Sequence, residues 1–249
     1  MVSQAAGARR RRGPAGVSGT ARARRAEPAG VGTRERLLAA AAAEFAARGF
    51  DGAKVDRIAA RAGINKAMLY YHFEDKAALY RDILDAQFGA LARTLREARP
   101  TDAAPEDEIR WFVRTVAAAL AANPHFPSIW LREMAEGGAH LQAATVTSMT
   151  TVVATLASIL TRGRRAGVFR DVPPFVTQLG IVGPLLMFAA SAPIRAKITP
   201  TLPEGTTRAV LNPPAESVLR HVERATLAAI ASGPPTGRRP PVSRRSRRS

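Results

Sequence analysis

Apolar residues recur along this chain at intervals of three and four positions, and no segment shows the sustained alternation that marks a β-strand. The first such pattern runs over residues 34–48, with Thr33 as its expected N-cap and Gly49 as its stop. Patterns of the same period predict further helices over residues 75–98, 105–122, 127–137, 139–166, 173–196 and 214–232. The chain is therefore predicted to be all-α.

Two shorter helical patterns lie between residues 55 and 73 and are joined at a glycine. Gly63 can adopt the left-handed conformation that ends a helix at low steric cost, and Asn65 is placed to cap the next helix. In that second helix Leu69 and Phe73 are expected to face the core. Exposed aromatic residues on its other face call for a partner, and a helix lying in the major groove of DNA would supply one. The pattern predicts a helix-turn-helix.

The same block of residues resembles the N-terminal domain of tetracycline-repressor (TetR) family regulators, over roughly residues 33–84. The residues that carry the resemblance are Phe45, Gly49, Phe50, Ile58, Ala59, Ala62, Gly63, Ile64, Leu69, Tyr70, Tyr71, His72, Phe73, Lys76 and Leu79. One departure is that Ala53 and Lys54 stand where the family usually has a threonine that caps the helix and contacts phosphate. Lys54 can supply the phosphate contact as a charge, but it cannot cap.

The resemblance implies an N-terminal three-helix DNA-binding domain with a helix-turn-helix, followed by a larger helical domain that binds a ligand and dimerises. It also implies that the last two long helices, here 173–196 and 214–232, pair with those of a second subunit. Both segments carry broad apolar surfaces that suit this role. We expect domain boundaries at 33–79 and 80–232.

The predicted DNA-contacting residues follow from side-chain chemistry and from the family resemblance. They are Lys54, Asn65, Lys66, Ala67, Met68, Tyr70, Tyr71, His72 and Lys76. Phosphate contacts are expected from Lys54, Tyr70 and Lys76, and such contacts set the register without reading sequence.

The base contacts are expected from the outward face of the second short helix. Lys66 can donate to guanine O6 or N7, while Ala67 and Met68 can meet thymine methyl groups. Tyr71 and His72 could contact either base or backbone, and the alternative for Tyr71 is that it covers the junction between helices.

The helix predicted over residues 105–122 is apolar almost all round, so other helices should surround it. Trp111 lies opposite its main apolar face and could line a cavity, because aromatic walls with few polar groups are typical of small-molecule pockets. Plain core packing is the alternative for each such residue. The candidate pocket residues are Phe88, Trp111, Thr115, Trp130, Met134, Met149 and Met187.

The net charge of +17 is concentrated in two low-complexity tails, 1–32 and 233–249, which carry +6 each. Neither tail has periodic apolar residues, so both are expected to be disordered. They either attract DNA phosphates without sequence specificity, or are solvated extensions whose composition reflects a genome that prefers arginine codons. The chain has no cysteine, which excludes disulfides and thiolate metal sites.

Two uncharged segments, 141–161 and 172–194, are long enough to span a bilayer. The polar threonines of the first and the prolines of the second favour an interior helix followed by an apolar helix at a subunit interface instead, so no membrane partner is expected. The first arginines are not followed by an apolar segment, so no secretory signal is predicted either.

Catalytic chemistry has little support in the sequence. No pair of histidines has metal-ligand spacing, and no phosphate loop or nucleophile elbow occurs. Glu133 and Glu136 beside Arg132 read as surface patterning, although either carboxylate could bind a cationic ligand if it pointed inward. No enzyme activity, cofactor or metal is therefore expected.

Together with the family resemblance, these observations predict a cytoplasmic, ligand-responsive transcriptional regulator, and a repressor is favoured over an activator because most members of the family repress. It would bind a palindromic operator in double-stranded DNA as a homodimer and would be released by a largely apolar small molecule. The rival hypotheses are a constitutive DNA-binding dimer without a ligand pocket, and a membrane-attached regulator.

Overall fold

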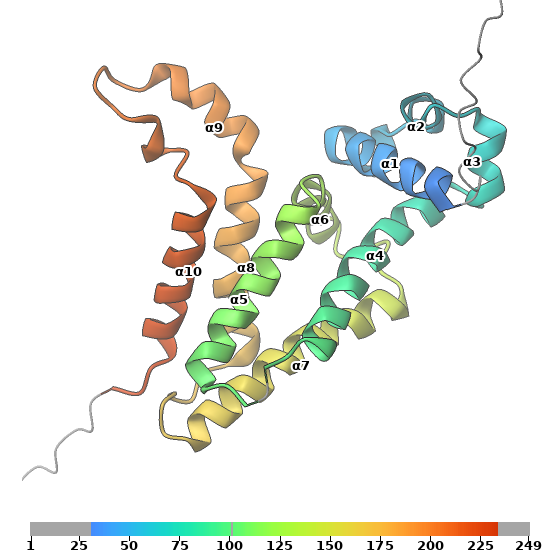
Figure 1. The fold of residues 1–249 in the computed structure, drawn as a ribbon. Coiled ribbons are helices and arrows are strands. Elements are labelled where there is room, and N and C mark those ends of the chain that lie inside the picture. The colour runs from blue at the N-terminus through green and yellow to red at the C-terminus, as the bar shows by residue number, and fades with distance from the viewer. Residues whose placement is uncertain (1–30, 101, 234–249) are drawn as a thin grey trace, which may run out of the picture.

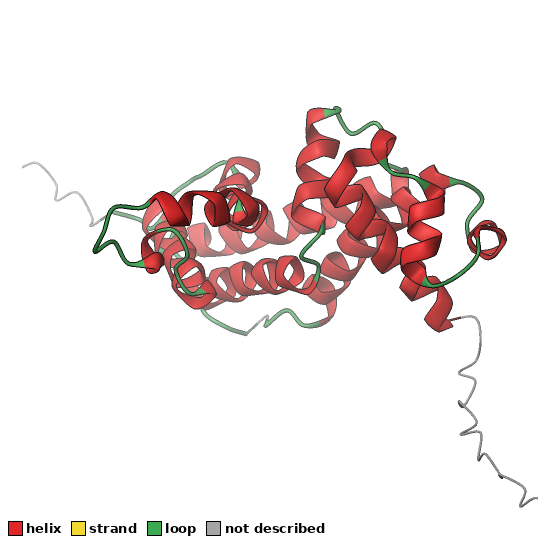
Figure 2. Ribbon diagram, turned by 90° about the horizontal axis from the view of Figure 1, so that it is seen from above, coloured by secondary structure: helices red, strands yellow, loops and turns green. Residues whose placement is uncertain are grey.

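The computed structural model describes residues 31–100 and 102–233, and the regular elements within these residues are helices (Figure 2). They are α1 (Val31–Gly52), α2 (Val55–Ala62), α3 (Lys66–His72), α4 (Lys76–Glu97), α5 (Pro105–Ala122), α6 (Phe126–Ala135), α7 (Ala143–Arg165), α8 (Pro174–Ala190), α9 (Ala192–Ile198) and α10 (Ala215–Ile230). Two 3-10 turns, η1 (Thr199–Thr201) and η2 (Arg208–Val210), lie between α9 and α10. The all-α prediction is confirmed for the described residues.

Helices α1 to α3 gather at one end of the molecule, and α4 runs from them into the remainder of the fold (Figure 1). There α4 packs along α7, α5 contacts α4, α7 and α8, and α10 lies against α5 and α8. Because α4 continues through the predicted boundary between residues 79 and 80, it links the two parts mechanically. The division into two domains stays a prediction.

The first helix differs from its prediction at the start and agrees at the end. It begins at Val31, so Thr33 lies inside it and is buried, and its hydroxyl accepts a hydrogen bond from Arg36 at 3.3 Å. Thr33 is therefore not the N-cap. The predicted tail over 1–32 overlaps the helix by two residues. The rest of that tail and residues 234–249 lie outside the described residues. Gly49 leaves the helical conformation, with φ 72°, as its predicted role as a stop requires.

Two later helices are shorter than predicted. The helix predicted over 139–166 begins at Ala143, because Gly137 and Gly138 adopt positive φ and reverse the chain after α6. The helix predicted over 173–196 ends at Ala190, and a separate helix, α9, follows with Pro193 in its first turn. A proline lacks the N–H that would continue the hydrogen-bond ladder, and its ring clashes with the preceding turn, so the break falls just before it.

By length and composition α7 could cross a membrane, and the pair formed by α8 and the segment 192–201, bent by 54°, passes the same test. Four threonine hydroxyls of α7 donate to backbone carbonyls one turn back, as Thr151 does to Thr147 at 3.1 Å and Thr155 to Thr151 at 2.9 Å, whereas Thr145 donates to the side chain of Asp85. This local bonding satisfies the hydroxyls without a ligand. Helix α7 packs against α4, α5 and α8 in this fold, and 33% of its most apolar window is buried.

The core of the larger part is built around α5. Its predicted apolar face is confirmed, because the residues on that face are all buried; they are Ile109, Phe112, Val113, Val116 and Leu120. Leu156 and Ile159 of α7 are fully buried in the same hydrophobic cluster. Burial of these side chains removes apolar surface from water, which is the main favourable term holding the helices together.

A buried carboxylate joins three helix ends near this core. Glu108 in the first turn of α5 is fully buried and pairs with Arg99, just after α4, at 3.3 Å and with Arg162, near the end of α7, at 2.5 Å. Arg99 also donates to the hydroxyl of Ser158 at 3.2 Å. A buried charge is tolerated only when it is paired, so this cluster ties the ends of α4 and α7 to the start of α5.

The substitution Glu108→Gln should lower the free energy of unfolding by about 3–5 kcal/mol, because it leaves two partly buried guanidinium groups without their carboxylate. Urea denaturation followed by circular dichroism measures the change. The matched control is Asp107→Asn, since Asp107 pairs with Arg110 at 2.7 Å on an exposed face and should cost less than about 1 kcal/mol. Equal losses in the two variants would contradict the role given to Glu108.

Candidate DNA-binding surface and adjoining cleft

Helices α2 and α3 are joined by the tight turn that the sequence predicts. Gly63 ends α2 in a left-handed conformation (φ 69°, ψ 34°), and its N–H donates to the carbonyl of Ala60 at 3.2 Å. A residue with a Cβ would be strained at this φ, so glycine permits the close turn. Ile58 and Ala62 of α2 are buried in the core. The helix-turn-helix is confirmed.

Helix α3 is seven residues long and is secured at both of its ends. The Asn65 side-chain oxygen accepts a hydrogen bond from the backbone N–H of Met68 at 2.8 Å, so the predicted N-cap is confirmed. Leu69 is fully buried, and Phe73, directly after the helix, is nearly so. Because so short a helix is unstable in isolation, α3 depends on this cap and on these two buried side chains.

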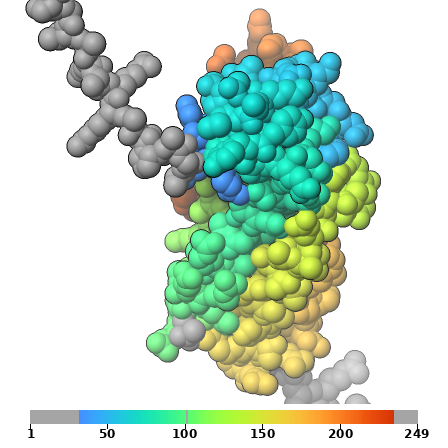
Figure 3. Space-filling model, turned by 90° about the vertical axis from the view of Figure 1, so that its right-hand side faces the viewer, coloured from blue at the N-terminus to red at the C-terminus, as the bar shows by residue number. Residues whose placement is uncertain are grey.

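The opposite face of α3 is open to solvent. Tyr71 exposes 80% of its surface and Tyr70 exposes 47%. Ala67 beside them is also exposed, and Met68 is partly exposed. Figure 3 shows α2, α3 and the start of α4 forming the upper part of the surface that faces the viewer. An exposed pair of aromatic side chains on a projecting helix is typical of a surface that meets a partner.

Lys66, at the start of this face, forms an ion pair with Asp56 of α2. The distance between Lys66 Nζ and Asp56 Oδ1 is 3.0 Å, and both side chains are exposed. The hydrogen bond to Asp56 and then its negative charge raise the pKa of Lys66, so this lysine stays protonated. An exposed ion pair contributes little to stability, so Lys66 can exchange Asp56 for a nucleic-acid acceptor at small cost.

The other two lysines of the predicted set differ from each other. Lys54 is exposed just before α2 and makes no capping hydrogen bond with its side chain, as expected. Lys76 instead donates to the carbonyl oxygen of Phe50 at 2.9 Å and lies 4.4 Å from the centre of the Phe50 ring. The end of a helix concentrates unpaired carbonyl groups and attracts a cation. The Lys76 ammonium group is thus directed to the end of α1, and the geometry does not support its predicted phosphate contact.

His72 is less exposed than its expected place on the outward face predicts. Its ring is half-buried, it stands edge-on to Tyr71 with ring centres 5.2 Å apart, and its Nε2 atom is buried without a hydrogen-bond partner among residues 31–100 and 102–233. His72 is the last residue of α3, and the chain leaves the helix in an extended conformation at Phe73. His72 therefore offers less of its surface to a partner than Tyr70 does.

Part of the predicted ligand pocket is an aromatic cluster. Phe88 of α4 and Trp130 of α6 meet edge-on with ring centres 4.9 Å apart, and Phe126 lies 5.6 Å and 6.3 Å from them. Edge-on aromatic pairs add packing energy beyond their buried area. The three rings fill space between α4 and α6, which is the core-packing alternative that the sequence left open.

The remaining predicted pocket residues do not converge on one cavity. Met134 and Met187 expose 45% and 55% of their surfaces, so they lie on the outside of the described fold, and their assignment to an interior pocket is wrong. Met149 is half-buried, and Thr115 donates its hydroxyl to the carbonyl of Trp111 at 2.9 Å. In helices that are apolar on nearly every side, periodicity does not indicate which face is inward.

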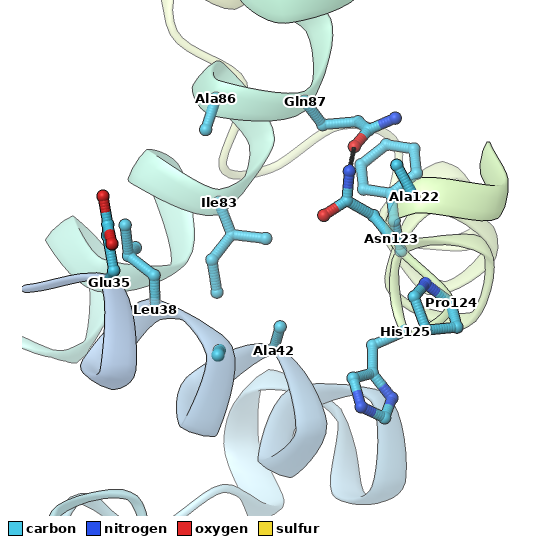
Figure 4. Close-up of a pocket in the computed structure, with 12 residues that line it drawn as sticks. Glu35, Leu38, Ala42, Ile83, Ala86, Gln87, Ala122, Asn123, Pro124 and His125 are labelled. Atoms are coloured by element: carbon cyan, nitrogen blue, oxygen red, sulfur yellow. Dashed lines mark hydrogen bonds between the residues drawn. The ribbon is translucent and has the colours of Figure 1, made fainter. Parts of the chain in front are cut away.

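The structure forms a cleft of about 420 Å³ where α1, α4 and the turn between α5 and α6 meet (Figure 4). At one side Gln87 accepts a hydrogen bond from Asn123 at 2.6 Å and donates to the carbonyl of Ala119 at 3.1 Å. Glu35 and His125 lie at opposite edges. The apolar walls are formed by Leu38, Ala39, Ala42, Ile83, Ala86 and Phe126.

Sequence reasoning missed this cleft, and its size lies within the range of small-molecule sites. Several of the wall residues are alanines, which leave room between helices but carry no distinctive signal in a sequence. The paired carboxamides of Gln87 and Asn123 could have drawn attention only if α4 and the end of α5 were known to be adjacent.

Two sequence profiles of known families match this chain. The profile described as "Bacterial regulatory proteins, tetR family" matches residues 37–83, which include the helix-turn-helix. The profile described as "Tetracyclin repressor-like, C-terminal domain" matches residues 105–192. The chain belongs to the TetR family. The predicted resemblance is thereby confirmed, and it extends well beyond the N-terminal block from which it was recognised.

Individual TetR-type relatives support the same fold. The HTH-type transcriptional repressor NicS of Pseudomonas putida is 28% identical over 141 residues, 56% of this chain and 66% of that protein. The ketosteroid transcriptional regulator KstR2 of Mycobacterium tuberculosis is 21% identical, with a TM-score of 0.61, covering 80% of this chain and 95% of that structure. FadR from Bacillus subtilis in complex with stearoyl-CoA is 16% identical, with a TM-score of 0.55, covering 76% and 96%. This chain spans less than two thirds of the length of the first curated relatives that it matches.

Removal of the α3 cap by Asn65→Ala should destabilise the helix by about 1 kcal/mol, because the N–H of Met68 loses its acceptor. Amide hydrogen exchange within α3 measures the loss, since a short helix can open without global unfolding. The control is Asn65→Asp, which restores a good N-cap and should keep exchange close to that of the unaltered protein. Equal exchange in both variants would mean that the cap does not stabilise α3.

Proposed function

We propose that this TetR-family protein is a DNA-binding transcriptional regulator, most simply a repressor, that binds a palindromic operator as a homodimer. The observation that carries the proposal is the construction of α3. One face of this helix is fixed in the core by Leu69 and Phe73, while Tyr70, Tyr71 and Ala67 face solvent. A rigidly held helix with an open face is what insertion into the major groove requires.

In this proposal the side chains of α3 and the side chain of Lys54, just before α2, have separate roles. Tyr70 and Lys54 contact phosphates and set the register, and Lys66 donates to guanine after leaving Asp56. Ala67 and Met68 meet thymine methyl groups. Tyr71, the most exposed of the aromatic pair, contacts DNA as well. Asn65 acts through its cap, which keeps the N-terminal turn of α3 in shape.

Dimerisation is proposed through α8 and α10. Phe175, Val176, Leu179 and Met187 are each more than half exposed and lie along one side of α8. Gly180 and Gly183 between them leave open space in which a second helix can approach closely. Large exposed apolar patches mark association surfaces, and a two-fold partner supplies the second reading helix for a palindrome.

Ligand response is proposed through the cleft of Figure 4, because both the helix-turn-helix region and the larger part line it. A small molecule seated between Leu38 of α1 and Phe126 of α6 would bind one relative placement of the two parts better than another. A difference of about 1–3 kcal/mol is enough for regulation. The apolar walls favour a largely apolar effector, with the carboxamides of Gln87 and Asn123 for orientation.

A constitutive DNA-binding dimer is the second candidate, and it is favoured by the closely packed interior. The predicted pocket residues Phe88 and Trp130 fill their space with one another and with Phe126. If no small molecule changes operator affinity although DNA is bound specifically, this candidate replaces the first. In both cases the protein acts in the cytoplasm, where the chromosome lies, and has no catalytic role.

Binding of the purified protein to DNA from around its own coding locus tests the DNA-reading proposal. Tyr70→Phe should weaken binding to all sequences severalfold through a lost phosphate contact, whereas Lys66→Ala should change base preference. Asp56→Asn should strengthen DNA binding for two reasons. Lys66 is no longer held by a carboxylate that competes with DNA, and a negative charge that repels the DNA phosphates is removed. A footprinting titration at fixed salt measures all three. The proposal would be overturned if these substitutions left DNA binding unchanged, or if removal of the arginine-rich termini alone abolished it.

Introducing charge into the α8 stripe tests the dimer. The double substitution Leu179→Glu and Met187→Glu should produce a monomer at micromolar concentration, because four carboxylates per dimer would be buried at the interface. Sedimentation velocity gives the mass in solution. The control is Val210→Glu, since Val210 is equally exposed and apolar but lies in η2. An unchanged dimer in the double variant would exclude this face.

A further inference from the structure

Glu133 near the end of α6 is an acidic side chain in the interior of the fold. It is fully buried, contrary to the surface role expected from its neighbour Arg132. One carboxylate oxygen accepts a hydrogen bond from the backbone N–H of His140 at 2.7 Å, and the other lies 3.0 Å from His140 Nδ1. A buried carboxylate needs strong compensation, and here its ion-pair partner is the His140 imidazole and not a lysine or arginine.

The turn after α6 brings these groups together. Gly137 and Gly138 both adopt positive φ (73° and 79°), and the N–H of Gly138 donates to the carbonyl of Glu133 at 2.9 Å. The chain therefore folds back over the last turn of α6, and His140 returns to Glu133. Glu136 joins the two, so that one ligand atom from each of Glu133, Glu136 and His140 lies within 4.8 Å of the others.

The basic side chains near this cluster contact groups other than its carboxylates. The Arg132 guanidinium lies against Gly49 and approaches the carbonyl of Ala46 at 3.5 Å, and Lys76 is held by Phe50. Glu136 forms no ion pair among the described residues. Burial raises the pKa of Tyr80, and the neighbouring charge of Glu133 raises it further, so this hydroxyl stays protonated beside the carboxylates.

We propose that Glu133, Glu136 and His140 form a binding site for a divalent transition-metal ion. Carboxylate oxygen and imidazole nitrogen together suit Zn²⁺, Co²⁺, Fe²⁺ or Mn²⁺, whereas Ca²⁺ and Mg²⁺ prefer oxygen ligands alone. The metal takes the place of the hydrogen bond between His140 and Glu133, and the neutral imidazole binds through Nδ1 with its ring proton on Nε2. Three protein ligands leave further positions for water.

This site would act on the joint between α1 and α4. The His140 ring packs 4.2 Å from the ring of Phe50, at the end of α1, and 4.9 Å from that of Tyr80 in α4. A metal that fixes His140 fixes the turn after α6 against both helices. It thereby stabilises one orientation of the helix-turn-helix relative to the larger part and changes DNA affinity.

Titration of the metal-free full chain with Co²⁺ tests the site without any need for DNA. We expect one Co²⁺ per chain, with visible absorption bands that disappear when Zn²⁺ competes. Glu136→Gln and His140→Asn should each weaken binding by more than about tenfold, since the loss of even an outer-shell partner costs that much. Glu136 is exposed, so its substitution leaves the fold intact even if His140→Asn disturbs the packing on Phe50.

The matched controls are Glu97→Gln and His221→Asn, which remove an exposed carboxylate and an exposed imidazole far from the turn. Both should bind Co²⁺ like the unaltered protein. Stoichiometric binding that survives Glu136→Gln, or the absence of Co²⁺ binding by the unaltered protein, would overturn the proposal. Because operator binding is measured separately in the presence of a chelator, failure of the metal site and failure of the proposed function are distinguishable.

Discussion

The aromatic contact between α1 and α4 is the interaction on which the rest of the structure depends. Tyr80 of α4 stands edge-on to Phe45 at 4.9 Å and to Phe50 at 5.2 Å, and Lys76 closes the same contact by holding the carbonyl of Phe50. Because α2 packs on α1 and α3 packs on α2, this contact determines where the reading helix points. Its disruption would leave α3 intact but would detach it from the helices that form the proposed dimer.

Both candidate regulatory sites involve the helices that this contact joins. The cleft of Figure 4 is lined by α1 and α4 on one side of the joint, and the cluster of Glu133, Glu136 and His140 lies at the turn after α6, which touches Phe50 and Tyr80. An effector needs no long pathway through the protein in this arrangement. It needs only to bind one placement of α1 on α4 more tightly than another, which is the general condition for allosteric coupling.

The sequence predicted those parts of the structure that are determined locally. The glycine at 63, the cap at Asn65 and the apolar spacing of α5 act over a few residues, and each is confirmed. Features that depend on distant partners were missed or misassigned. Lys76 is drawn to the end of α1, Glu133 is buried by a turn seven residues later, and Met187 faces outward on a helix that is apolar on every side. Periodicity describes one helix, whereas these positions depend on which helices meet.

The small size of the joint explains why a weak ligand could regulate it. The two aromatic contacts of Tyr80, at about 0.5–1.5 kcal/mol each, and one ammonium–carbonyl hydrogen bond amount to a few kcal/mol beyond their buried area. A coupling of about 1–3 kcal/mol is a large fraction of that sum, whereas the same energy would barely affect the core around Phe112. The helix-turn-helix can therefore change its orientation while the larger part keeps its packing. In a dimer the displacement of both reading helices adds, because the two half-sites must be contacted at once.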